Sequence, residues 1–109
     1  MRHDYQDRVS LVMARRVADE LSRRPELIDF ARANLDRWSL LNANAPGLMR
    51  CYDEWRGLLG RSIPEVITIL TAESDEGERL RQNSPFAGIL TPQEVWAIKR
   101  HERDDQAAA

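Results

Sequence analysis

Cysteine and histidine carry the most recognisable chemistry, and the chain has one cysteine, Cys51, and two histidines, His3 and His101. A catalytic thiolate requires a nearby base and a polar, partly exposed setting. Cys51 instead lies close to Tyr52 and Trp55, on the apolar side of an expected helix. The histidines stand near opposite ends of the chain, without the cysteine or carboxylate spacing of a metal motif. We therefore predict a core position for Cys51, and no catalytic residue, metal site or cofactor.

Acidic residues occur in adjacent pairs, such as Asp53-Glu54 and Asp75-Glu76. Neighbouring side chains on a helix point about 100° apart, so neither pair predicts the shared-proton dyad of an acid–base catalyst. The segment Gly57-Leu58-Leu59-Gly60 falls at an expected helix end and does not resemble a phosphate-binding loop. Together with the absence of a nucleophile–base pair, this pattern indicates a protein that is not an enzyme.

The basic residues are nearly all arginines, and they are unevenly distributed. The whole chain has a net charge of −2, which opposes binding dominated by phosphate contacts. The first 24 residues, however, contain six basic and four acidic residues and are net +2. A small DNA-binding transcriptional regulator is therefore one alternative, with Arg15, Arg16, Arg23 and Arg24 as its nucleic-acid contacts.

The segment 62–83 has the length of a helix-turn-helix motif, but its charge is unfavourable for DNA. The second helix of this segment would begin with Asp75, Glu76 and Glu78. In a recognition helix these carboxylates would face phosphates and base edges in the major groove. We therefore do not expect nucleic acid to be the main partner.

Apolar residues recur at helical spacing along nearly the whole chain, which predicts an all-α fold. We expect a single compact domain of five or six helices over residues 1–104, with a long N-terminal helix over 4–24 and a frayed tail over 105–109. The sole cysteine excludes an intrachain disulfide. No secretory signal is recognisable, and no apolar run approaches the about 20 residues of a membrane helix. We expect a cytoplasmic protein without membrane contact.

Prolines and capping boxes predict where the later helices begin. Pro25 suits the first position of a second helix, and a third is expected from Pro46 to about Leu59, with Gly60 as its left-handed C-terminal residue. Two segments have the Ser/Thr-x-x-Glu pattern in which side chains and amides bond reciprocally at a helix start. These capping boxes are Ser62-Ile63-Pro64-Glu65 and Thr91-Pro92-Gln93-Glu94.

Two features indicate a surface for a partner. The apolar arc of the first helix is wider than one packing contact requires, which is typical of helix–helix association. The loop from Ser84 to Leu90 carries large apolar side chains, and Phe86 either closes the core as a plug or presents an anchor to a partner; we favour the plug. The candidate partner-binding residues are Val9, Met13, Arg16, Val17, Phe86, Ile89, Leu90 and Trp96.

The stretch from Arg79 to Trp96, RLRQNSPFAGILTPQEVW, resembles the C-terminal signature of a group of small helical bacterial proteins. The upstream segments Asn34-Leu35-Asp36-Arg37-Trp38 and Tyr52-Asp53-Glu54-Trp55 are similar to further elements of that group, and the resemblance covers about residues 17–100. Members resemble antitoxins encoded beside a toxin gene. The resemblance implies binding and restraint of a toxic enzyme, such as a nuclease or nucleotidyltransferase, and supplies no catalytic residue.

We therefore expect an antitoxin-like protein that neutralises a partner toxin by protein–protein contact, the toxin being encoded by an adjacent gene. The usual antitoxin has a basic DNA-binding module joined to a long polar tail, and this chain shows no such tail. We therefore do not expect the protein to repress its own promoter. Besides the DNA-binding regulator, a helical homo-oligomeric structural or adaptor subunit, for example a homodimer, remains an alternative.

Overall fold

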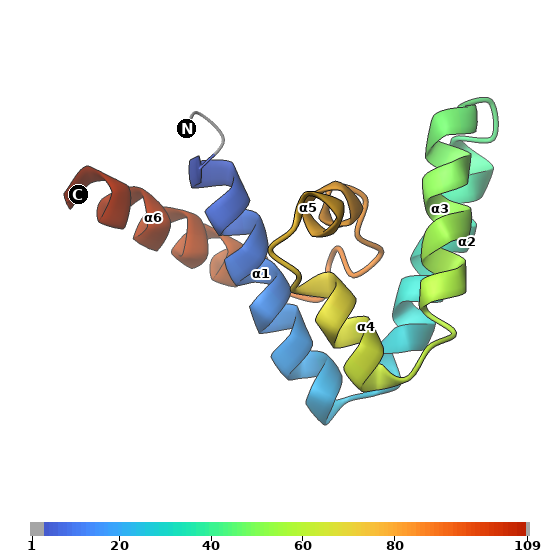
Figure 1. Cartoon of the computed structure of the whole chain (residues 1–109), viewed down its shortest axis with the longest axis horizontal. Coiled ribbons are helices and arrows are strands. Elements are labelled where there is room, and N and C mark those ends of the chain that lie inside the picture. Colours follow the sequence, from blue (N-terminus) through green and yellow to red (C-terminus); the bar gives the residue numbers. More distant parts are fainter. Residues whose placement is uncertain (1–3, 109) are drawn as a thin grey trace.

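Six α-helices make up the fold of residues 4–108, the part of the chain that the computed structural model describes (Figure 1). This range contains no β-strand, so the predicted all-α class and the long first helix are confirmed. The helices are α1 (Asp4–Arg23), α2 (Leu27–Leu41), α3 (Pro46–Leu58), α4 (Ile63–Leu70), α5 (Asp75–Arg81) and α6 (Pro92–Ala108).

The capping residues begin three of these helices. At α6 both bonds of the capping box form, because Thr91 Oγ1 accepts from the Glu94 amide at 3.1 Å and Glu94 accepts from the Thr91 amide at 3.0 Å. Ser62 Oγ accepts from the Glu65 amide at 3.3 Å at the start of α4. Ser74 Oγ accepts from an α5 amide in the same way. Local side-chain chemistry therefore determines where these helices start.

Three predicted boundaries were wrong. Pro25 lies in a turn, and α2 begins two residues later at Leu27. Gly60 does not take a left-handed conformation; within the described residues the only positive φ belongs to Gly88, at 96°. Residues 105–108, expected to fray, continue α6 as far as Ala108. Polar and alanine residues at a chain end predict fraying only weakly, because alanine is the strongest helix former.

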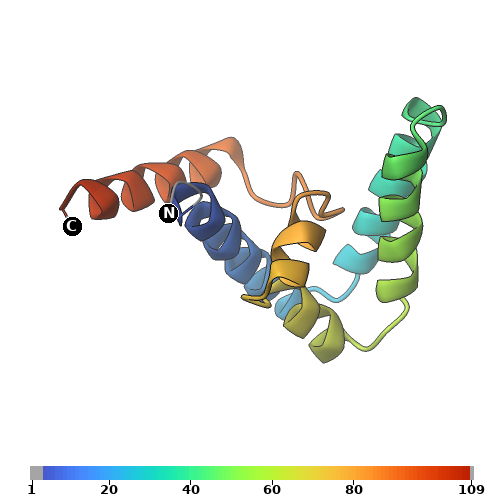
Figure 2. The same cartoon turned by 45° about the horizontal axis from the view of Figure 1, so that its top comes forward.

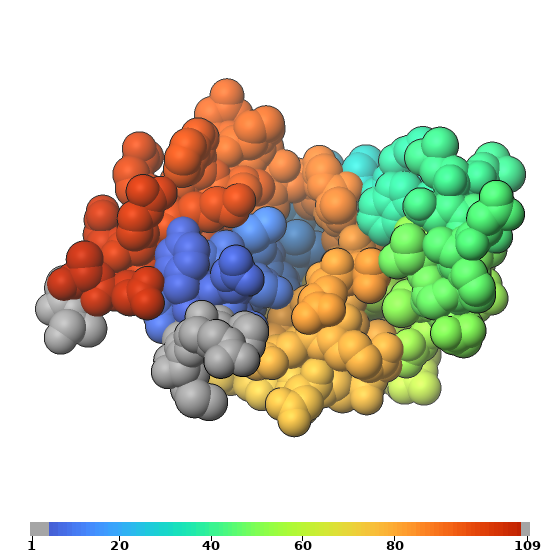
Figure 3. All heavy atoms as spheres, turned by 90° about the horizontal axis from the view of Figure 1, so that it is seen from above, coloured from blue at the N-terminus to red at the C-terminus, as the bar shows by residue number. Residues whose placement is uncertain are grey.

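The helices form two groups, which Figures 1 and 2 show from different directions. The helices α2 and α3 make an antiparallel hairpin on one side of the molecule. On the other side α1 packs against α4, α5 and α6, and α6 extends away from the hairpin. Seen from above, α1 lies between α6 and the α4–α5 segment (Figure 3). None of the described helices has the length and apolar content needed to cross a membrane.

The core lies where the hairpin meets α1, α4, α5 and the segment that precedes α6. Trp55 is 1% exposed, and its indole N–H donates to the Leu80 carbonyl at 3.1 Å. Phe86, 2% exposed, packs edge-on against Trp55 with the ring centres 6.3 Å apart. The prediction that Phe86 plugs the core is therefore confirmed. The remaining fully buried side chains include Leu21, Leu35, Val66 and Leu70.

Asn34 fixes the loop that carries Phe86. This buried amide donates to the carbonyl oxygens of Pro85 at 2.8 Å and Ala87 at 3.1 Å. Arg37 in turn donates to the Asn34 side-chain oxygen. The left-handed Gly88 follows directly, a conformation that a side chain would strain. The Asn34 segment and the Phe86 segment, both part of the resemblance described above, are thus in direct contact.

Candidate functional site

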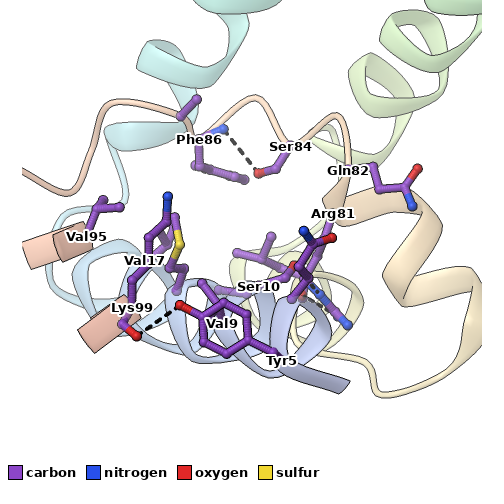
Figure 4. Close-up of a pocket in the computed structure, with 15 residues that line it drawn as sticks. Tyr5, Val9, Ser10, Val17, Arg81, Gln82, Ser84, Phe86, Val95 and Lys99 are labelled. Atoms are coloured by element: carbon purple, nitrogen blue, oxygen red, sulfur yellow. Dashed lines mark hydrogen bonds between the residues drawn. The ribbon is translucent and has the colours of Figure 1, made fainter. Parts of the chain in front are cut away.

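A cavity of about 540 Å³ opens between α1, α5, the 82–90 loop and α6 (Figure 4). Val9, Met13 and Val17 project from one stripe of α1 because they recur every four residues. Phe86 borders the cavity from the loop, and Val95 borders it from α6. A largely apolar cavity of this size is in the range of small-molecule binding sites.

Arg81, at the end of α5, supplies the buried polar part of the cavity wall. The residue is only 8% exposed. Its Nε donates to Ser10 Oγ at 3.2 Å, and its Nη1 donates to the carbonyl oxygens of Leu70 at 3.3 Å and Ala72 at 2.5 Å. These acceptors are uncharged, and among the side chains of residues 5–107 no carboxylate lies within 4.0 Å of the guanidinium.

Three contacts connect α1 to α6 along the same side of the molecule. Arg16 pairs with Glu94 at 2.9 Å, and Arg8 pairs with Glu102 at 3.4 Å. The Tyr5 hydroxyl donates to the backbone carbonyl of Lys99 at 3.0 Å, as Figure 4 shows. The Thr91 amide, followed by the Thr91 hydroxyl and Arg16, lowers the pKa of Glu94 below its ordinary value. Glu94 therefore both caps α6 and attaches it to α1.

The four arginines predicted as nucleic-acid contacts all pair with carboxylates. Arg15 lies 3.4 Å from Glu73, and Arg16 contacts both Glu20 and Glu94. Arg23 and Arg24 pair with Glu20 at 2.5 and 3.1 Å. The hydrogen bond from Arg23 is the largest cause that lowers the pKa of Glu20, and Arg16 and Arg24 act in the same direction. A phosphate backbone would have to compete with these carboxylates.

The structure separates the predicted partner-binding residues into buried and exposed groups. Four of them have at most 8% of their surface exposed, so they cannot contact a partner unless the protein opens, and their assignment to a binding surface is corrected here. These four are Val9, Val17, Phe86 and Leu90. Met13, Arg16 and Ile89 are half-buried. Only Trp96, at 61% exposure, presents most of its side chain to solvent.

Trp96 is the centre of a shallow surface on α6, which it forms with Gln93, Arg100, Arg103 and Asp104. On its other side it borders a second hollow that Lys99 also lines. Among the side chains of residues 5–107, no carboxylate oxygen lies within 4.0 Å of the charged groups of Lys99, Arg100 or Arg103. We call these residues, Gln93, Trp96, Lys99, Arg100, Arg103 and Asp104, the Trp96 surface.

The residues first considered for chemistry do not come together. His3 lies outside the described residues, and Cys51 is half-buried on α3. His101 lies near Glu102 and Asp105, with side-chain donor atoms that are all within 4.8 Å of one another. Glu102 is already the ion-pair partner of Arg8, and His101 and Asp105 are exposed, so we assign no metal to this group.

The sequence reasoning missed the polar residues of the cavity. Arg81 belongs to a short charged helix, where its position predicts a solvated side chain. Only the fold brings it beside Ser10, which is 71 residues away. The regular spacing of Val9, Met13 and Val17 was a usable signal for the apolar wall, although it did not distinguish a cavity from a filled core.

Comparison of the chain with family models, curated proteins and solved structures finds no match.

Proposed function

We propose that the protein is an antitoxin-like binding protein that neutralises a partner enzyme through the Trp96 surface. The observation that carries this proposal is the exposure of Trp96, at 61%, among cations that have no carboxylate partner among the side chains of residues 5–107. Tryptophan and arginine are the residue types that contribute most often to binding energy in protein interfaces. Exposing a large aromatic side chain to water is otherwise unfavourable.

The charge of the Trp96 surface indicates the chemistry of the partner. Lys99, Arg100 and Arg103 line the two hollows that Trp96 borders, and Asp104 is the one acidic residue that lines them. Such a surface is complementary to an apolar notch bordered by aspartate or glutamate residues. We therefore propose an acidic contact region on a toxin encoded by the adjacent gene, in keeping with the resemblance of residues 17–100.

The DNA-binding alternative has less support than the protein partner. Its four arginines pair with carboxylates, as described above. The helix α6 carries three basic and four acidic residues, so it is net −1 with histidine neutral. Phosphate binding favours a basic surface, and this helix as a whole is not one. A homo-oligomer that uses the Trp96 surface is an alternative outcome of the experiment below.

Co-expression with the product of the adjacent gene tests the proposal. We expect the two proteins to co-purify and the chain to restore growth that the partner inhibits. Trp96→Ala should weaken binding by about 2 kcal/mol or more, with a nearly unchanged melting temperature because the side chain is exposed. Leu40→Ala is the matched control, since Leu40 is 83% exposed but lies on α2.

Two results would contradict this function. Failure of both co-purification and growth rescue would exclude the antitoxin-like role. Partner binding that Trp96→Ala leaves unchanged would exclude the Trp96 surface as the contact. If the isolated chain is a dimer that Trp96→Ala dissociates, the homo-oligomeric subunit replaces the antitoxin as the explanation of this surface.

A further inference from the structure

We infer that the cavity between α1 and α6 binds a small monocarboxylic acid with an apolar body, whose carboxylate pairs with Arg81. The cavity and the Trp96 surface share Lys99, but Arg81 belongs to the cavity alone and Trp96 does not line it, so ligand binding can be tested separately from the proposed protein partner. The inference rests on the charge of Arg81, on the donor atoms that the fold leaves available, and on the composition of the wall.

Arg81 is a buried cation without a charged partner among the side chains of residues 5–107. Burial of a charge is costly unless the group is paired and hydrogen-bonded. The carbonyls of Leu70 and Ala72 lie at the C-terminal end of α4, where the helix dipole provides a partial negative charge. This contact compensates only part of the charge, since a helix end is equivalent to about half an elementary charge.

The Nη2 atom of Arg81 is the donor that remains available. Residues 5–107, whose side chains the structure describes, give it no hydrogen-bond partner, whereas Nε and Nη1 have three acceptors between them. Within this part of the chain no buried side-chain nitrogen or oxygen lacks a partner. Nη2 must therefore retain accessible surface, and Arg81 borders the cavity. The Ser10 hydroxyl beside it accepts from Nε and keeps its own proton to donate to an anion.

The rest of the wall fits an apolar body. Val9, Val17 and Phe86 border the space on the sides of α1 and the loop, as Figure 4 shows. Met13 also lines it from α1. The wall contains two cationic residues, Arg81 and Lys99, and no aspartate or glutamate. A largely apolar space of about 540 Å³ with two cationic residues in its wall and no carboxylate favours a molecule that is both anionic and apolar. A charged peptide segment would leave its polar backbone against these apolar side chains.

Three ligands that share an eight-carbon chain test the inference on the full-length wild-type protein: octanoate, 1-octanol and octylammonium. Calorimetry and amide chemical shifts should show octanoate binding about tenfold more tightly than octanol, as expected for a hydrogen bond to a charged group. Octylammonium should bind most weakly. The largest shifts should fall on Val9, Met13 and Phe86. Equal affinities for octanoate and octanol, no binding of either, or shifts confined to α2 and α3 would overturn the inference.

Substitutions test whether the charge of Arg81 causes the preference for octanoate. Arg81→Gln should bring the affinity for octanoate down to that for octanol, whereas Arg61→Gln, which changes an exposed arginine between α3 and α4, should leave the preference intact. Met13→Trp should fill the space and abolish binding of both ligands. A folded Arg81→Gln variant that still prefers octanoate would overturn the role of Arg81. If Arg81→Gln does not fold, the three-ligand comparison and Met13→Trp decide the question.

Discussion

The loop that precedes α6 has two different sides. Towards the α2–α3 hairpin it is fixed by the two hydrogen bonds from Asn34 and by the edge-on contact of Phe86 with Trp55. Towards α1 and α6 the same loop borders a cavity of about 540 Å³. One segment therefore joins a close-packed region of the molecule to a hollow one.

The difference follows from what each side offers the loop. The hairpin contributes the Trp55 ring, which packs against the loop, and the Asn34 amide, which donates to two loop carbonyls. These contacts fill the space and exclude water. On the other side α6 packs mainly against α1 and is attached there by Arg16, Arg8 and Tyr5. These ion pairs and this hydrogen bond attach α6 to α1, but they do not fill the cavity between the two helices. The loop is thus closely packed on its hairpin side, and the accessible space lies at α1 and α6.

Phe86→Ala should produce the largest loss of stability, because it empties the packed side of the loop. The side chain is 2% exposed, and truncation of such a phenylalanine costs about 3–5 kcal/mol. Chemical denaturation followed by circular dichroism measures this loss. Trp96→Ala, which removes a ring of similar size from the exposed face of α6, is the control and should change stability by less than about 0.5 kcal/mol. Equal losses for the two variants would contradict the comparison.

The elements of the fold could largely be predicted because their signals are local. The Thr91 and Glu94 side chains bond to amides three residues away, so the start of α6 is contained in four consecutive residues. The core position of Phe86 could also be favoured over an anchor for a partner, because burial of a large apolar ring away from water is favourable. The end of α6 could not be predicted, because a tail of polar residues and alanines is compatible with both a helix and a frayed end.

The site was less predictable because it depends on contacts between distant segments. Arg81 is buried because α5 packs beside α1, and nothing in its neighbourhood in sequence distinguishes it from the exposed Arg79. The arginines that did attract attention, such as Arg23 and Arg24, are neutralised by Glu20 on the same helix. Their spacing to Glu20 was visible in the sequence and could have reduced the weight of the DNA-binding alternative.

Replacing one alanine on each side of the loop with leucine compares the packing of the two sides directly. Ala31 is completely buried on α2, so Ala31→Leu should overpack the hairpin side and cost about 1–3 kcal/mol. Ala14 lines the cavity from α1, and Ala14→Leu has space into which the added atoms can extend. Its effect on the free energy of unfolding should be within about 1 kcal/mol. Thermal and chemical denaturation measure both; a larger loss for Ala14→Leu would show that the cavity side is the better packed.

Acidification should give the smallest effect and should loosen α6 before the hairpin. Glu94 connects α6 to α1, whereas Glu54 connects α3 to α5 through two bonds from Arg79, at 3.1 and 2.8 Å. The Thr91 amide lowers the pKa of Glu94, and the Arg79 side chain lowers that of Glu54. Each carboxylate therefore stabilises the fold above its ordinary pKa of about 4.5, and this contribution is lost as the pH falls through the lower pKa of the folded state.

The two sides should respond differently to this loss because only one has a packed core behind the carboxylate. Amide hydrogen exchange between pH 6 and pH 3, corrected for intrinsic rates, should show protection falling first in α6. Glu94→Gln should reproduce the loss of α6 protection at neutral pH and flatten its pH dependence, while Glu54→Gln should leave α6 unchanged. Simultaneous loss of protection in α6 and in the α2–α3 hairpin would mean that the two sides unfold as one unit, and that the packed loop transmits stability across the cavity.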